Sequence, residues 1–201
     1  EIGGGYGALA RLIKSQKDVT YILIDLPEIN LISSYYLKKN FPNKKFFFYD
    51  DYRKKISSKI IKDNDFIILN PWCKMGDCKI DLFINITSMM EMNFKSVKKY
   101  FETIHKNISN NGFFYNVNRY YHDIVGHPII FNRYPYDNRW KVIVSEKSWG
   151  KKRIHELITQ RSRRKSNNIN IEMKKIELIS KKYTPIWIIA KLKMIRRKLF
   201  F

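Results

Sequence analysis

A glycine-rich turn at the start of the sequence constrains the fold more than any other feature. Gly3, Gly5 and Gly7 lie at alternate positions. Glycine has no Cβ and tolerates positive φ, so backbone amides in such a turn can approach an anionic or zwitterionic ligand. Asp25 follows Gly5 by twenty residues, at the end of the apolar run 19–25, where a carboxylate can accept hydrogen bonds from both ribose hydroxyls of a nucleoside. Together these features predict a nucleoside cofactor at the switch point of a doubly wound sheet.

Apolar runs and helical patterns alternate along the chain. The apolar runs predict strands at 19–25, 45–49, 65–70, 81–86, 113–118 and 140–144, and the helical spacing predicts helices at 28–41, up to about 62, and at 94–108. An Asn-Asn-Gly turn at 110–112 is expected to close the last of these helices. The alternation is typical of an α/β protein with a Rossmann-like, doubly wound and mainly parallel sheet.

The chain length allows one sizeable core. One domain is expected over residues 1–161, truncated at its first strand because the sequence starts inside the glycine motif. Residues 162–201 are expected to form a basic linker and an amphipathic C-terminal tail. In that tail Ile188, Leu192, Ile195 and Leu199 share one helical face, so the tail could lie on an anionic membrane or dock on the core.

The charge balance is strongly basic, with 39 Lys and Arg against 18 Asp and Glu and a net charge of +21. Such a charge attracts nucleic acid, anionic lipid or phosphorylated substrates, although Lys is abundant throughout and compositional drift explains it equally well. Cys73 and Cys78 are too few for a disulfide framework or a structural zinc site, and no metal site is predicted. No run reaches the roughly 18 apolar residues of a membrane span, and no secretory signal is visible, so we expect a cytoplasmic protein.

Two cofactor classes fit the glycine turn. Gly3, Gly5 and Ala8 also satisfy the G-x-G-x-x-G/A fingerprint of NAD(P)-dependent oxidoreductases with a Rossmann fold, and Asp25 lies at a fitting distance. The acidic Glu1 in front of the glycines instead resembles motif I of the methyltransferases, whereas the dinucleotide fingerprint usually has an apolar residue there. The glycine motif by itself leaves both classes open.

Residues 81–92, Asp-Leu-Phe-Ile-Asn-Ile-Thr-Ser-Met-Met-Glu-Met, are followed by a helix and by Asn-Asn-Gly-Phe-Phe-Tyr-Asn-Val-Asn-Arg. They resemble the sugar O-methyltransferases of bacterial polysaccharide gene clusters. The segments 24–27 and 135–140 and the pair at 155–156 fit the same family, so the resemblance covers roughly residues 1–161. Only the region from Ser88 to Glu91 and Met92 is specific to it. The resemblance implies a class I fold, S-adenosylmethionine (SAM) as cofactor, and methyl transfer to a saccharide hydroxyl in cell-surface polysaccharide or glycoconjugate biosynthesis.

The expected site residues lie at the strand ends and in the glycine turn. The cofactor is expected to contact the following residues: Glu1, Gly3, Gly5, Gly7, Asp25, Asp50 and Asp51. Asp50 and Asp51 follow the Phe-rich strand, where methyltransferases often place a carboxylate on the adenine amine. Two adjacent acids in a solvated loop explain the same pattern equally well.

Methyl transfer to a hydroxyl requires a base that removes the hydroxyl proton. Glu91 is the first candidate, because it follows Ser88 in the loop after a strand, at the carboxyl edge of the sheet. A helix N-terminal carboxylate is the alternative explanation. His122 and His127 follow the fifth strand and could act as base or as metal ligands, or be ordinary surface histidines.

The segment Asn70-Pro71-Trp72 is similar to the Asn-Pro-Pro-aromatic motif with which nucleic-acid methyltransferases hold a flipped base. One proline is missing. The strand that leads into the long helix is 81–86, so Asn70 is expected on the preceding element. An RNA or DNA methyltransferase stays an alternative, favoured by the net charge.

Overall fold

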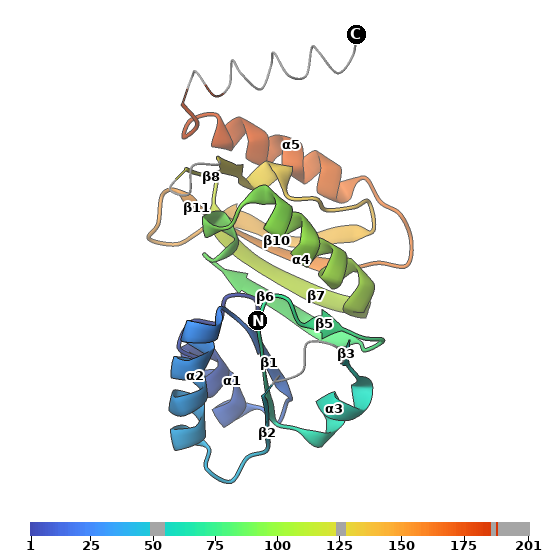
Figure 1. Cartoon of the computed structure of the whole chain (residues 1–201). Helices are drawn as coiled ribbons and strands as arrows, with labels where there is room; N and C mark the ends of the chain where they lie inside the picture. The colour runs from blue at the N-terminus through green and yellow to red at the C-terminus, as the bar shows by residue number, and fades with distance from the viewer. Residues whose placement is uncertain (49–54, 124–127, 186–187, 189–201) are drawn as a thin grey trace.

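The computed structural model describes residues 1–48, 55–123, 128–185 and 188, in which helices flank a central sheet (Figure 1). The elements are, in chain order, α1 (Ala8–Gln16), β1 (Tyr21–Ile24), α2 (Pro27–Asn40), β2 (Phe46–Phe48), β3 (Lys55–Ile56), α3 (Ser58–Asp63), β4 (Phe66–Leu69), β5 (Lys74–Met75), β6 (Ile80–Ile86), the 3-10 helix η1 (Met89–Glu91), α4 (Phe94–Asn107), β7 (Ile108–Arg119), β8 (Tyr121–His122), β9 (Ile129–Ile130), the 3-10 helix η2 (Phe131–Arg133), β10 (Trp140–Lys147), β11 (Ile154–Arg161) and α5 (Asn168–Ser180). This alternation of strands and helices confirms the predicted α/β class.

Two groups of strands form the sheet, and the first two residues of the chain connect them. In one group β1, β4 and β2 are parallel, in the order β1-β4-β2. In the other group β6 and β7 are parallel, and β11 and β10 continue antiparallel. Between β1 and β6, the Ile24 amide donates to the Glu1 carbonyl (2.9 Å) and the Ile2 amide donates to the Ile84 carbonyl (2.8 Å). The mainly parallel sheet predicted from the sequence is confirmed, with an antiparallel pair at one edge.

A cavity of about 440 Å³ lies between β1 and β6, next to Glu1 and Ile2. Its lining comes mainly from apolar side chains of both strands, among them Ile22, Ile80 and Leu82. The expected truncation at the first strand and the domain boundary at residue 161 stay predictions.

The strand beside β1 is β4, and the Phe-rich β2 lies outside β4. All four residues of β4 are buried, whereas β2 is at best half-buried. Phe66 and Ile68 of β4 pack in one hydrophobic cluster and Ile67 and Leu69 pack in the other. Both faces of the strand are thus covered, which suits its continuous apolar run. The residue that follows β4, Asn70, therefore lies at the strand end next to Asp25.

The strand β7 begins at Ile108, directly after α4, so the predicted Asn-Asn-Gly turn between them is wrong. Ile80 pairs with Ile108 but Leu82 pairs with Phe113, so β7 carries extra residues relative to β6. Asn111 adopts the left-handed conformation (φ 64°) within this extra segment. The Asn-Asn-Gly residues thus form a bulge inside a strand, because the buried Ile108 already pairs with β6.

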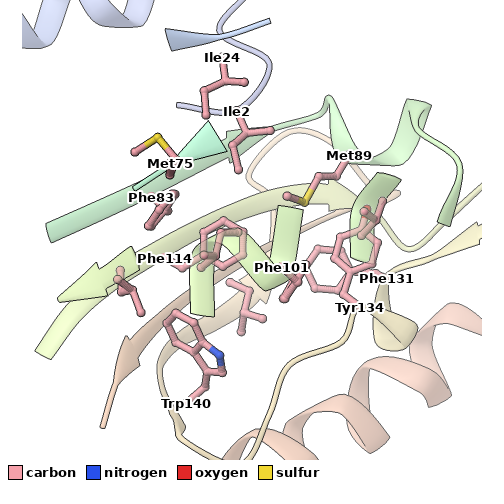
Figure 2. Close-up of a cluster of buried hydrophobic side chains, with 14 of the residues drawn as sticks. Ile2, Ile24, Met75, Phe83, Met89, Phe101, Phe114, Phe131, Tyr134 and Trp140 are labelled. Carbon is pink, nitrogen blue, oxygen red and sulfur yellow. The ribbon is translucent and has the colours of Figure 1, made fainter. Parts of the chain in front are cut away.

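One hydrophobic core holds α4 and α5 against β6, β7, β10 and β11 (Figure 2). Phe101 of α4 meets Phe114 of β7 in a T-shaped pair, with 5.7 Å between ring centroids. The ring centroid of the fully buried Trp140 of β10 lies 6.2 Å from the ring centroid of Phe114. Ile169 and Ile176 of α5 belong to the same cluster, so the chain beyond residue 161 packs on the domain at least as far as α5. Most of the expected amphipathic tail, residues 189–201, lies outside the described residues.

A buried histidine links α5 to the antiparallel strands. Ser145 Oγ of β10 donates to Glu172 Oε1 of α5 (2.7 Å), so His155 Nε2 of β11 donates to Ser145 Oγ (2.9 Å). His155 Nδ1 then accepts from Tyr120 Oη (2.9 Å). Burial lowers the pKa of His155 to about 4, although Glu172 and Glu156 oppose the shift. His155 is therefore neutral in the folded protein at neutral pH.

We expect the free energy of unfolding to decrease by about 3 kcal/mol as the pH falls from about 6.5 to 4. The folded-state pKa of His155 lies below the unfolded value of about 6.5, so its contribution is complete above pH 6.5 and is lost on acidification. Urea denaturation at several pH values measures this dependence. The His155→Gln variant should lose most of it, and an equal pH dependence in both proteins would contradict the prediction.

Candidate cofactor-binding and catalytic site

The glycine turn lies at the carboxyl edge of the sheet and leads directly into α1. Gly3, Gly5 and Gly7 have φ values of 74°, 55° and 90°, a region that L-residues with a Cβ rarely adopt. Gly7 is the N-cap of α1, and no side chain caps this helix end. The first amides of α1 and the positive end of its dipole are thus free to face a ligand. A Cβ on Gly5 would meet no atom within 4 Å, so open space lies beside the turn.

Asp25 holds this turn in place. Its Oδ2 accepts from the Gly5 amide (2.8 Å) and its Oδ1 accepts from the Leu26 amide (2.8 Å). A carboxylate has about four acceptor positions, so both oxygens of the half-buried Asp25 can still accept hydrogen bonds from hydroxyl groups. The predicted pair of glycine turn and acidic strand end is therefore assembled as a unit.

Glu1 lies beneath the turn. Its Oε2 accepts from Tyr21 Oη (2.8 Å), and a Cβ on Gly4 would lie 3.2 Å from the same oxygen. Burial raises the pKa of Glu1, and the hydrogen bond from Tyr21 lowers it in part. Glu1 is adjacent to the glycine backbone, so its expected part in cofactor binding stays a prediction that the geometry allows.

An asparagine, Asn70, occupies the strand end next to Asp25. Asn30 Nδ2 of α2 lies 2.8 Å from the Asp25 carbonyl, 2.9 Å from the Leu69 carbonyl and 3.0 Å from Asn70 Oδ1, so its two N–H groups are shared among three acceptors. This side chain connects the ends of β1 and β4. The sequence analysis did not predict this contact. Because β4 and not β2 adjoins β1, Asn70, and not a residue after β2, lies at the strand end next to Asp25.

This strand order bears on the predictions for Asp50, Asp51 and Asn70. Asp50 and Asp51, expected at the adenine, lie outside the described residues, and the strand that leads to them is β2. Their role stays a prediction. The expectation that Asn70 lies on the element before the strand 81–86 is confirmed, since Asn70 follows β4 and β6 leads into η1 and α4.

Ser88 lies directly against the glycine turn. Its Oγ donates to the Ile2 carbonyl (3.0 Å), and a Cβ on Gly3 would lie only 2.0 Å from the same oxygen. Thr87 precedes it with φ 62°, a left-handed conformation that costs a β-branched residue about 1–3 kcal/mol. This strained residue turns the chain after β6, so that Ser88 returns to Gly3. The segment that carries the family resemblance thus contacts the glycine turn.

Glu91 and His122, the two candidate catalytic residues, come from elements that pack together. Glu91 is exposed at the end of η1, and β8, which carries His122, packs on η1. Burial and the nearby Arg119 lower the pKa of His122, and Glu91 and Asp123 oppose this shift. The two candidates therefore share one site at the carboxyl edge of β6 and β7.

The hydrogen bonding of His122 limits what it can do. Arg119 lies 3.1 Å from His122 Nδ1, and because a guanidinium only donates, Nδ1 must accept and the proton of the neutral ring lies on Nε2. Nε2 is buried and has no hydrogen-bond partner within the described residues. His122 therefore offers a donor rather than a base, and Glu91 remains the candidate base. His127 lies outside the described residues.

A chain of buried asparagines, missed in the sequence, supports the loop that carries Glu91. Asn85 of β6 donates to the Ile2 carbonyl (2.7 Å) and accepts from the Met89 amide (3.2 Å). Asn118 of β7 donates to Asn85 Oδ1 (2.7 Å) and accepts from the Met90 amide (3.0 Å). The available signal was polar Asn inside otherwise apolar strands, since a buried amide needs partners.

No group of three or more His, Cys, Asp or Glu side chains in the described parts of the chain is arranged to hold a metal ion. Cys73 and Cys78 are both free thiols. No described helix is long and apolar enough to cross a membrane.

The fold is similar to two solved structures. One is the PH0226 protein from Pyrococcus horikoshii OT3, with a TM-score of 0.55, 10% identity and 80% of each chain covered. The other is the mitomycin 7-O-methyltransferase MmcR, with a TM-score of 0.51, 12% identity, and 80% of this chain and 48% of that chain covered. The chain has a methyltransferase fold. At such low identity the likeness concerns the fold alone; no protein-family model matches the sequence, and no curated protein matches it.

Proposed function

We propose that the protein is a SAM-dependent O-methyltransferase that methylates a saccharide hydroxyl. The observation that carries the proposal is the contact between the glycine turn, held by Asp25, and the segment of Ser88 and Glu91. The first part suits a nucleoside cofactor, and the second brings a carboxylate to the same sheet edge. The saccharide is supported by the resemblance of residues 81–92 to sugar O-methyltransferases.

The residues present fit SAM. Amides of the glycine turn and of the α1 N-terminus would face the anionic part of the cofactor, Asp25 would accept from its ribose hydroxyls, and Asn70 would lie near the adenine. When bound, SAM supplies a methyl group for in-line displacement by the acceptor oxygen. Glu91 would orient the acceptor hydroxyl and take its proton as the new oxygen–carbon bond forms. His122 would act as a positioning residue, because its strand β8 packs on η1, which carries Glu91.

Calorimetry with S-adenosylhomocysteine (SAH) and with NADH tests the cofactor class. We expect SAH to bind and NADH to bind weakly or not at all. Tight binding of NADH without binding of SAH would instead assign the glycine turn to an NAD(P)-dependent oxidoreductase.

An Asp25→Asn variant is expected to bind SAH about 10- to 100-fold more weakly, which is the usual effect of losing hydrogen bonds to a charged acceptor. The amide can still contact the turn, so the fold should persist. Asp63→Asn, an exposed change at the end of α3, is the matched control and should leave SAH affinity unchanged. Equal affinities of both variants would contradict the assigned role of Asp25.

A nucleic-acid methyltransferase is the second candidate, favoured by the net charge of +21 and by Asn70-Pro71-Trp72. Trp72 is half-exposed, as a base-stacking residue would be. Labelled SAM, incubated with total RNA, with DNA and with a cell-surface saccharide extract, separates the two. We expect label in the saccharide fraction, and strong, salt-dependent labelling of RNA or DNA would favour the second candidate.

A further inference from the structure

The hairpin between β10 and β11 carries an unusual tip. Trp149 has 97% of its surface exposed, so it contributes almost no buried area to the fold. Gly150 beside it adopts φ 75°, and the turn is closed by bonds from the Ser148 amide to the Ile154 carbonyl and from the Lys151 amide to the Ser148 carbonyl. An ordered turn thus presents a large aromatic ring to its surroundings.

The same turn is strongly basic. Residues 147–153 include Lys147, Lys151, Lys152 and Arg153 and no acidic residue, and all four basic residues are exposed. None of them forms an ion pair with a residue in the described ranges. We call residues 147–153 the basic tip. It combines one almost fully exposed indole with four exposed basic side chains.

The basic tip lies at the carboxyl edge of the sheet. Ile154, at the start of β11, pairs with Arg119 at the end of β7, and the Tyr120 amide donates to the Arg153 carbonyl (3.0 Å). The tip therefore adjoins the segment that carries His122. The basic tip and the candidate active site therefore lie at the same edge of the sheet.

The C-terminal part of the chain starts from the same place. Tyr183, just after α5, donates through its Oη to the Lys152 carbonyl (2.8 Å), so the end of α5 lies against the tip (Figure 1). Residues 186–201 contain five basic residues, Trp187 and two phenylalanines, and no acidic residue. The described chain after α5 therefore contacts the basic tip through Tyr183, and the sequence that follows is also basic and aromatic.

We propose that the basic tip docks the protein on an anionic lipid membrane. Trp is enriched at membrane interfaces, where its ring lies at the level of the headgroups, and exposed Lys and Arg are attracted to anionic lipid. Nucleic-acid binding usually combines a basic groove with stacking platforms, whereas this site is a projecting turn with a single indole. Docking in this way turns the carboxyl edge of the sheet, and with it the candidate active site, toward the lipid. The docking itself does not depend on methyl transfer.

Sedimentation of the full 201-residue chain with lipid vesicles tests the proposal. We expect binding to phosphatidylcholine vesicles that contain phosphatidylglycerol, and little binding to phosphatidylcholine alone. Lys151→Gln with Lys152→Gln should weaken binding about 25-fold, at roughly fivefold per charge, and Trp149→Ala should weaken it independently. Lys59→Gln with Lys62→Gln, which removes two exposed charges from α3, is the matched control and should have a much smaller effect.

Several outcomes would overturn the proposal. The first is that the protein does not bind the anionic vesicles, and the second is that the tip variants bind them as the wild type does. The third is that the α3 control loses as much vesicle binding as the tip variants. The fourth is that the protein binds RNA through the tip and does not bind the vesicles. Circular dichroism confirms that each variant is folded. SAH affinity measured on the same preparations separates a failure of docking from a failure of the proposed enzymatic function.

Discussion

Replacing Glu91 with Gln is expected to lower kcat by about 10²- to 10⁴-fold, the usual contribution of a general base. Glutamine keeps the size of the side chain but cannot take the hydroxyl proton. Glu91 is exposed, while Met89 and Met90 anchor η1 in the core, so the fold and the SAH affinity should not change. The loss should therefore appear in kcat, with little change in cofactor binding.

Methyl transfer from labelled SAM to the saccharide extract measures this effect. The matched control is Glu102→Gln, an exposed change on α4, which should retain full activity. If Glu91→Gln transferred methyl groups at the wild-type rate, Glu91 would not be the base, and its carboxylate would have only the helix-terminal role considered from the sequence.

Gly3→Ala should destabilise the protein and weaken SAH binding. Gly150→Ala should destabilise the protein less and leave SAH binding unchanged. Both glycines have nearly the same φ, 74° and 75°, so both alanines carry about 1–2 kcal/mol of left-handed strain. A Cβ at Gly3 would also lie 2.0 Å from Ser88 Oγ, but a Cβ at Gly150 would meet no atom within 4 Å. Overpacking should add about 1–3 kcal/mol at Gly3.

Urea denaturation and SAH calorimetry of both variants provide the measurement. The difference between the two isolates the contact between the glycine turn and Ser88, because the backbone strain cancels. Equal losses of stability, with SAH affinity unchanged in the Gly3 variant, would show that this contact is not required for the site.

The helices and strands were largely predictable because each depends on residues close together in the chain. The four residues of β4 are aliphatic or aromatic throughout, as a strand covered on both faces requires. In α4 the buried Val97, Phe101 and Ile104 follow the helical spacing. The bulge in β7 was misinterpreted as a turn, because Asn-Asn-Gly suits both, and only the pairing of Ile108 with β6 distinguishes them.

The candidate site was predictable only in its local parts. Gly3, Gly5 and Gly7 were recognisable because a tight turn at a strand end demands residues that tolerate positive φ, and Asp25 because a carboxylate ends the next apolar run. The proximity of Glu91 and His122, and the tautomer that Arg119 imposes on His122, depend on how β8 packs on η1. No local pattern encodes that packing.

Sequence alone was thus sufficient for the α/β class, the glycine turn and its acidic partner, since these follow from periodicity and from the conformational demands of single residues. The arrangement of the candidate site depends on tertiary contacts. These contacts bring Ser88 against Gly3 and Asn70 next to Asp25. They also pack Asn85 and Asn118 against the loop that carries Glu91. Strand order and the pairing of buried polar groups are set by which surfaces cover one another in space. The bond from Met90 to Asn118 spans 28 residues of chain and the bond from Ser88 to Ile2 spans 86, so no short segment contains that information.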